Sequence, residues 1–79
     1  MKTTPNQFLE TYTDIGHAIA HFIDLRTISD VFVYPNEIAV IFKKNETVYP
    51  MLGDFQNMLK VGLINFRIDS DSIVLYFKH

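Results

Sequence analysis

Two similar segments of this chain constrain its fold most: "IAVIFKK" at 38–44 and "IVLYFKH" at 73–79. Both are rich in β-branched and aromatic residues, which is typical of strands. Each follows another strand-like run, separated from it by turn-forming residues, "PNE" in the first case and "DSDS" in the second. The sequence therefore predicts two β-hairpins, one within 30–45 and the other within 63–79.

The two hairpins resemble each other in their residues. Ile, Phe and Lys recur at corresponding places of the second strands, and Phe32 and Phe66 hold similar places in the first strands if the turns differ by one residue. A duplicated helix-hairpin unit would explain the likeness. Amphipathic strands also converge on such patterns, so both explanations stay open.

Helices are predicted before each hairpin. Thr4 can cap a helix with Pro5 in its first position, and Gln7 completes a capping-box spacing. Apolar side chains then recur at steps of three and four, which predicts one amphipathic helix ending near residue 26: Phe8, Tyr12, Ile15, Ile19 and Phe22. A second helix is expected at about residues 50–61, with Gly62 after its end.

These elements predict a single α+β domain over residues 1–79, in the order α-β-β-α-β-β. The simplest closed arrangement is a four-stranded antiparallel sheet with both helices on one face. The segment "ETVY" at 46–49 is either a fifth short strand or the approach to the second helix.

The composition of the chain makes several classes of function unfavourable. A net charge of −2 makes general nucleic-acid binding unfavourable, because such binding relies on clustered Lys and Arg. The chain has no cysteine, which excludes thiol catalysis and cysteine-based metal sites. No signal peptide or membrane span is recognisable, so a cytoplasmic protein is expected.

The sheet face away from the helices is the first candidate site. Strand residues alternate between faces, and the helices should cover the more apolar sets, including Ile64, Phe66 and Ile68. The outer face then keeps an apolar centre with a basic rim, which predicts a protein-binding surface: Ala39, Ile41, Lys43, Arg67, Val74, Tyr76 and Lys78. The partner is either a second copy, as in a homodimer, or another protein, and an edge strand offers a second route by sheet extension.

A polar stripe on the first helix is the second candidate site. Its members follow steps of four and three opposite the apolar stripe: Glu10, Asp14, His17, His21 and Asp24. The spacing of the two histidines permits shared metal coordination, but "HAIAH" lacks the glutamate of the HExxH motif. A solvated face or an acidic partner-binding face is favoured over a metal site.

No catalytic constellation and no cofactor site is recognisable, because the three glycines are scattered and no serine lies in a nucleophile motif. We therefore expect a small non-enzymatic interaction protein, such as an inhibitor carried by a phage or plasmid. The alternative is a small nucleic-acid-binding module that uses the aromatic and cationic sheet face.

Overall fold

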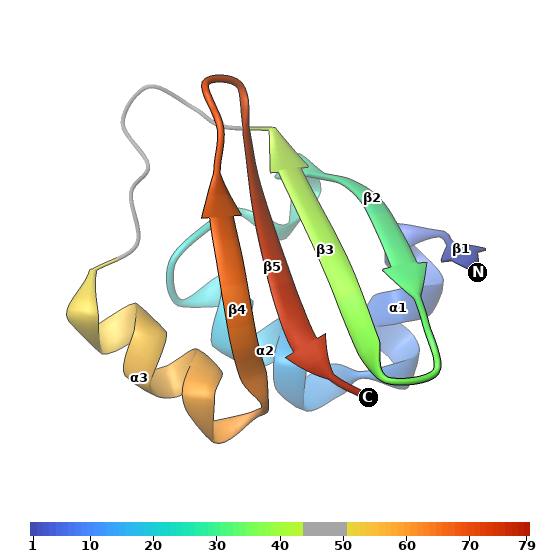
Figure 1. Cartoon of the computed structure of the whole chain (residues 1–79), viewed down its shortest axis with the longest axis horizontal. Coiled ribbons are helices and arrows are strands. Elements are labelled where there is room, and N and C mark those ends of the chain that lie inside the picture. The colour runs from blue at the N-terminus through green and yellow to red at the C-terminus, as the bar shows by residue number, and fades with distance from the viewer. Residues whose placement is uncertain (44–50) are drawn as a thin grey trace.

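A computed structural model describes residues 1–43 and 51–79 of the chain. Five antiparallel strands form one sheet in the order β1-β2-β3-β5-β4 (Figure 1). The strands are β1 (Lys2–Thr3), β2 (Ile28–Val33), β3 (Glu37–Lys43), β4 (Leu63–Ile68) and β5 (Ser72–Lys78). The helices are α1 (Pro5–Thr11), α2 (Thr13–Ala20) and α3 (Leu52–Lys60), with a short 3₁₀ turn, η1 (Leu25–Thr27), before β2.

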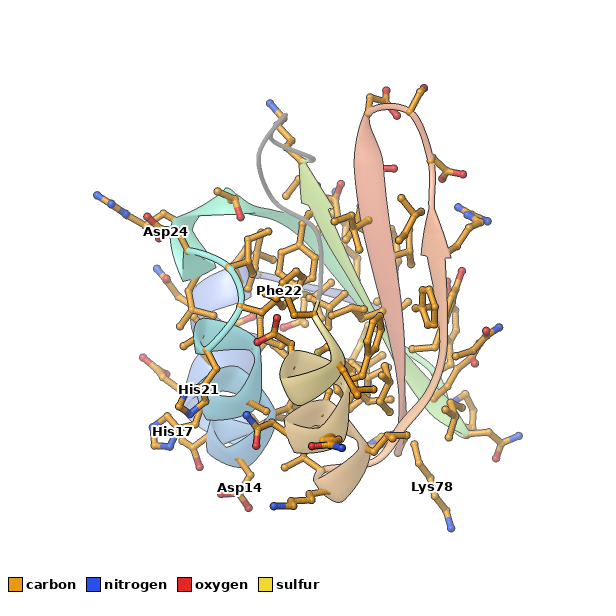
Figure 2. The ribbon with its side chains drawn as sticks, turned by 90° about the vertical axis from the view of Figure 1, so that its left-hand side faces the viewer. Asp14, His17, His21, Phe22, Asp24 and Lys78 are labelled. Carbon is orange, nitrogen blue, oxygen red and sulfur yellow. The ribbon has the colours of Figure 1, made fainter. Side chains whose placement is uncertain are left out.

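The predicted α+β class is confirmed, together with both hairpins. The sequence predicts four strands, and the structure adds a fifth, β1, which was not predicted. The possible strand at 46–49 lies outside the described residues. All three helices pack against the same face of the sheet (Figures 1 and 2).

The first predicted helix is two helices. Thr4 caps α1 as expected, and its hydroxyl accepts a hydrogen bond from the Gln7 N–H at 3.2 Å. At Tyr12 the backbone leaves the helical region, with φ −116° and ψ 63°, and the chain restarts as α2. Tyr12 stands between two threonines, whose β-branched side chains favour helices weakly. The expected end near residue 26 was also wrong, because α2 stops at Ala20.

The core lies between the helices and the inner face of the sheet. Phe8, Ile15 and Ile19 of the predicted apolar stripe are buried there. A row of paired strand residues runs across the same face from β2 to β4. Val31 pairs with Val40, Val40 with Leu75, and Leu75 with Phe66. The first three of these side chains are 0% exposed, whereas Phe66 is 44% exposed. The inner face of the sheet is therefore buried from β2 to β5 but partly exposed at β4.

The expectation that the helices cover the apolar set of β4 was therefore wrong. Ile64, Phe66 and Ile68 are exposed by 56, 44 and 41%. β4 lies at the edge of the sheet, and its Ile68 end continues past α3 (Figure 1). The helix layer does not reach the Ile68 end of the strand. At the other end Ile64 lies where the register with β5 shifts between Leu63 and Asn65, so the regular alternation does not hold there.

The pairing also corrects the correspondence between the hairpins. Phe32 pairs with Ala39 on the outer face, whereas Phe66 pairs with Leu75 on the inner face. By register the position of Phe66 in the second hairpin matches that of Val31 in the first. β3 and β5 share the same burial pattern along their lengths. The duplication stays a prediction.

Candidate partner-binding surface

Most of the large exposed apolar side chains among the described residues lie on or next to α3 and β4, whereas Met1 and Tyr34 lie elsewhere. We define the α3–β4 surface by Phe55, Leu59, Ile64, Phe66 and Ile68. Leu59 is 60% exposed, a large fraction for a leucine next to a packed core. A shallow groove of about 290 Å³ lies within this surface, and its lining residues are Phe55, Leu59, Leu63, Ile64, Asn65 and Phe66. Such a continuous apolar patch is typical of binding surfaces, whereas scattered exposed apolar residues are not.

Local chemistry fixes the two elements of this surface relative to each other. The Asp54 carboxylate accepts a hydrogen bond from the Met51 N–H at 2.8 Å, which caps the start of α3. Gly62, with φ +100°, provides the left-handed turn between α3 and β4. Phe55 then packs against Phe66, with ring centroids 4.8 Å apart. The two phenylalanine rings that line the groove are therefore packed against each other.

The outer sheet face, predicted as the main binding surface, is less open than the sequence suggested. Ala39 and Val74 lie at its centre and are only 5 and 3% exposed. Ala39 pairs with Phe32 and Tyr76 on either side, and Val74 pairs with Ile41 and Arg67. Ile41 and Tyr76 are half-buried. Lys43, Arg67 and Lys78 are exposed at the rim, so the structure does bring the predicted residues onto one face.

Charges on this outer face are partly neutralised by neighbours. Lys2 pairs with Asp30 at 3.0 Å, and Arg67 pairs with Asp69 at 3.1 Å. Phe32 and Tyr34 stack in parallel there, with centroids 6.3 Å apart. The rings suit base stacking, but paired cations are poorly placed to neutralise phosphates.

The predicted polar stripe is exposed along its length but does not form one continuous helix face. Glu10 lies on α1, and Asp14 and His17 lie on α2, beyond the break at Tyr12. His21 follows the end of α2, and Asp24 lies in the loop after it (Figure 2). Within residues 1–43 and 51–79, no three metal-ligating side chains are close enough to hold an ion.

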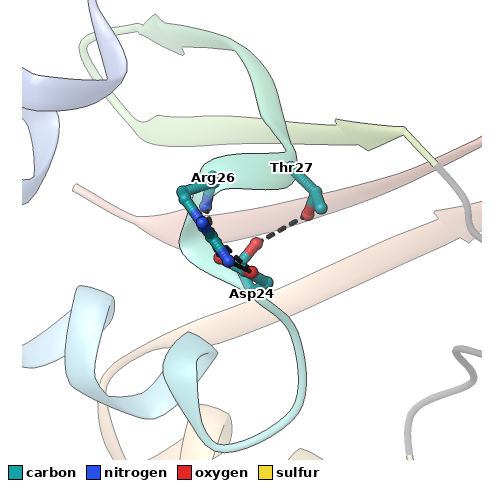
Figure 3. A network of polar contacts seen from close by, with 3 residues as sticks. All are labelled: Asp24, Arg26 and Thr27. Atoms are coloured by element: carbon teal, nitrogen blue, oxygen red, sulfur yellow. Dashed lines mark hydrogen bonds and ion pairs between the residues drawn. The ribbon is translucent and has the colours of Figure 1, made fainter.

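Asp24 has a structural partner instead (Figure 3). Its carboxylate accepts hydrogen bonds from the Arg26 guanidinium at 2.7–3.2 Å and from the Arg26 backbone N–H at 2.9 Å. These bonds lower the pKa of Asp24 from 3.8 to about 2. The Thr27 hydroxyl donates to the Asp24 carbonyl oxygen at 2.7 Å, which completes the 3₁₀ turn before β2.

The His79 ring is held by two hydrogen-bonding contacts to distant residues. Its Nδ1 lies 2.7 Å from the Tyr34 carbonyl oxygen, and its Nε2 lies 3.0 Å from the Tyr12 hydroxyl. Because a carbonyl only accepts, Nδ1–H donates to the Tyr34 carbonyl oxygen, and Nε2 shares a hydrogen bond with the Tyr12 hydroxyl. His79 thus links the helix break to the β2–β3 turn. Single-sequence periodicity contains no signal for such a contact.

Comparison of the chain with protein-family models, with curated proteins and with solved structures found no match. In the part of the chain that the structure describes, no helix has the length and apolarity needed to span a membrane.

Proposed function

We propose that this chain is a non-enzymatic protein-interaction module and that a protein partner binds its α3–β4 surface. The observation that carries the proposal is the exposure of Leu59, Ile64 and Phe66 around one apolar groove. Covering these side chains removes apolar area from water, which is the main favourable term in protein association. The predicted contacts on the outer sheet face and on the polar helix stripe stay predictions.

The chemistry of the groove fits a protein partner. Its lining is almost entirely apolar, with Asn65 as the one polar side chain. It is also partly open to solvent, whereas small-molecule sites enclose most of their ligand. A broad apolar partner surface, such as a strand or a helix face, would cover it.

A narrower form of the proposal is an inhibitor encoded by a phage or plasmid and acting in the cytoplasm. It is supported only by the small size of the chain and its net charge of −2. An acidic protein of this size can occupy a basic groove of a target enzyme. The binding experiment below would identify such a target.

Site-specific photo-crosslinking tests the proposal. A photoreactive amino acid replaces Ile64 in one protein and Asn6, an exposed residue of α1, in a matched control. In host cells the Ile64 position should give a defined covalent adduct with a protein, either foreign or a second copy, and the Asn6 position should not. The absence of any adduct specific to Ile64 would refute the proposal.

A further inference from the structure

The backbone of β4 has a free edge among the described residues, because β4 pairs there with β5 alone. The Asp69 N–H donates to the Ser72 carbonyl at 2.9 Å, so Asp69 is turned toward β5. Residues of an antiparallel strand alternate in direction, which turns the N–H and C=O groups of Ile68 and Phe66 outward. The Phe66 N–H agrees with this direction, since it donates to the Asn65 side-chain oxygen at 2.9 Å.

The opposite edge of the sheet, formed by β1, has features that block pairing with another chain. There β1 is two residues long, and its Thr3 pairs with Val31 of β2. Lys2 of β1 also forms an ion pair with Asp30. Short strands and charged side chains are common ways to block an edge from pairing with another chain. β4 is six residues long, and Ile64 is an extra residue where its register with β5 shifts between Leu63 and Asn65. From Asn65 to Ile68 the strand pairs regularly with β5, and Phe66 and Ile68 are exposed beside this regular part of the edge.

We propose that the partner on the α3–β4 surface is a second copy of this chain, and that the two β4 strands pair antiparallel about a two-fold axis at Phe66. The inference rests on the proposed function and names its partner. The result is a continuous sheet of ten strands with the helices of both copies on the same face, because a two-fold axis perpendicular to a sheet preserves its faces.

The register follows from the residues that become opposite. With the axis at Phe66, Ile64 lies opposite the second copy's Ile68, and Asn65 lies opposite the second copy's Arg67. Moving the axis to Arg67 would place two arginines directly opposite, which is unfavourable. Moving it to Ile68 would pair Phe66 with the β4–β5 turn. Of these three axes, only the one at Phe66 places residues 65–67 of both strands opposite each other without opposing like charges.

Pairing in this register changes one hydrogen bond. The Phe66 N–H leaves the Asn65 side chain and donates to the Phe66 carbonyl of the second copy. The freed Asn65 oxygen then faces the guanidinium of the second copy's Arg67, which can donate to it. Phe55, which packs against Phe66, is brought beside the axis. The apolar groove of each copy is thereby covered.

Single cysteines test the register, because the natural chain contains none. In the Phe66→Cys protein the two new thiols lie across an antiparallel pair, with Cα atoms about 5.5 Å apart, which suits a disulfide. In the Ile64→Cys protein the two thiols lie roughly 14 Å apart, because four residues of strand separate them. A Thr13→Cys protein, with the change on an exposed position of α2, reports random collisions.

Mild oxidation should cross-link the Phe66→Cys protein at least tenfold faster than the Ile64→Cys and Thr13→Cys proteins. An equal mixture of the Ile64→Cys and Ile68→Cys proteins should cross-link faster than the Ile64→Cys protein alone. Both proteins in the mixture keep Phe66. Their cross-linking therefore still reports the register if removal of the Phe66 ring weakens pairing of the two β4 strands. Rates equal to that of the Thr13→Cys protein in both experiments would overturn the proposed pairing.

Sedimentation of the natural chain separates this inference from the proposed function. Self-pairing predicts a particle of twice the 9.2 kDa chain mass at millimolar concentration. A strict monomer that still gives an Ile64-specific adduct with a foreign protein would overturn self-pairing and support the proposed function. A strict monomer with no adduct would overturn both.

Discussion

Phe55 of α3 and Phe66 of β4 pack their rings together, with centroids 4.8 Å apart and planes tilted by 41°. The contact joins the edge strand to the helix beside it. Phe66 is nevertheless 44% exposed, so only part of its ring is used inside one copy of the chain. The same ring therefore stabilises the fold and lines the groove that we assign to a partner.

This ring contact should be measurable as a coupling energy. Phe55→Ala and Phe66→Ala, singly and together, form a double-mutant cycle in urea unfolding. We expect the losses of unfolding free energy to be non-additive by about 0.5–1.5 kcal/mol, which is typical of packed aromatic pairs. Unfolding is measured at a low protein concentration, so that any dimer has dissociated. Additive losses would contradict a direct contact.

Asp24 should make stability depend on pH in the acid range. Its folded pKa of about 2 lies below the ordinary 3.8, so its contribution is present above about pH 4 and is lost as the pH falls toward 2. Asp24→Asn keeps a side-chain acceptor for the Arg26 N–H but removes the charge. The melting temperature of the natural chain should exceed that of Asp24→Asn near neutral pH, with the gap closing in acid and in high salt. A gap independent of pH would count against the ion pair.

Two glycines should respond in opposite directions to alanine. A Cβ at Gly53 on α3 meets no atom within 4 Å, so Gly53→Ala should raise the unfolding free energy by up to about 1 kcal/mol through helix propensity. Gly62 has φ +100°, which an L side chain rarely adopts, so Gly62→Ala should lower it by about 1 kcal/mol or more. Thermal or urea unfolding measures both. A stabilising Gly62→Ala would show that the α3–β4 turn differs from the structure.

Nucleic-acid binding through the outer sheet face should be absent. Two of its cations are paired with Asp30 and Asp69, and the net charge is −2. Fluorescence anisotropy with mixed single-stranded oligonucleotides should show no binding even at low salt. Binding that weakens steeply with salt and is lost in Phe32→Ala would instead support the nucleic-acid alternative.

Residue alternation predicted the inner faces of β3 and β5 correctly. Ile38 and Phe77 are buried against the helices, as their period of two indicated. The same alternation placed Phe66 with them, and the register confirms that it points to the inner face. Its exposure could not be predicted, because alternation shows which face a side chain shares but not how far the helices extend over it.

The helix break at Tyr12 could not be predicted from the apolar stripe either. The apolar stripe continues from Phe8 to Ile15 on either side of it, because both helices pack on the same sheet. Periodicity therefore gave one helix where the backbone forms two. The strand order and the link between Tyr12 and His79 depend on contacts between distant residues, which a single sequence does not record.

If a second chain completes the α3–β4 surface along β4, the outward amides of this strand become hydrogen-bonded. Hydrogen exchange at the Phe66 and Ile68 amides, followed by NMR across a dilution series, tests it most directly. We expect both outward amides to exchange slowly at high protein concentration and to exchange faster together on dilution, while the Val40 amide in the sheet centre stays protected. Fast exchange at Phe66 and Ile68 over the whole series, as fast as in an exposed turn, would contradict it.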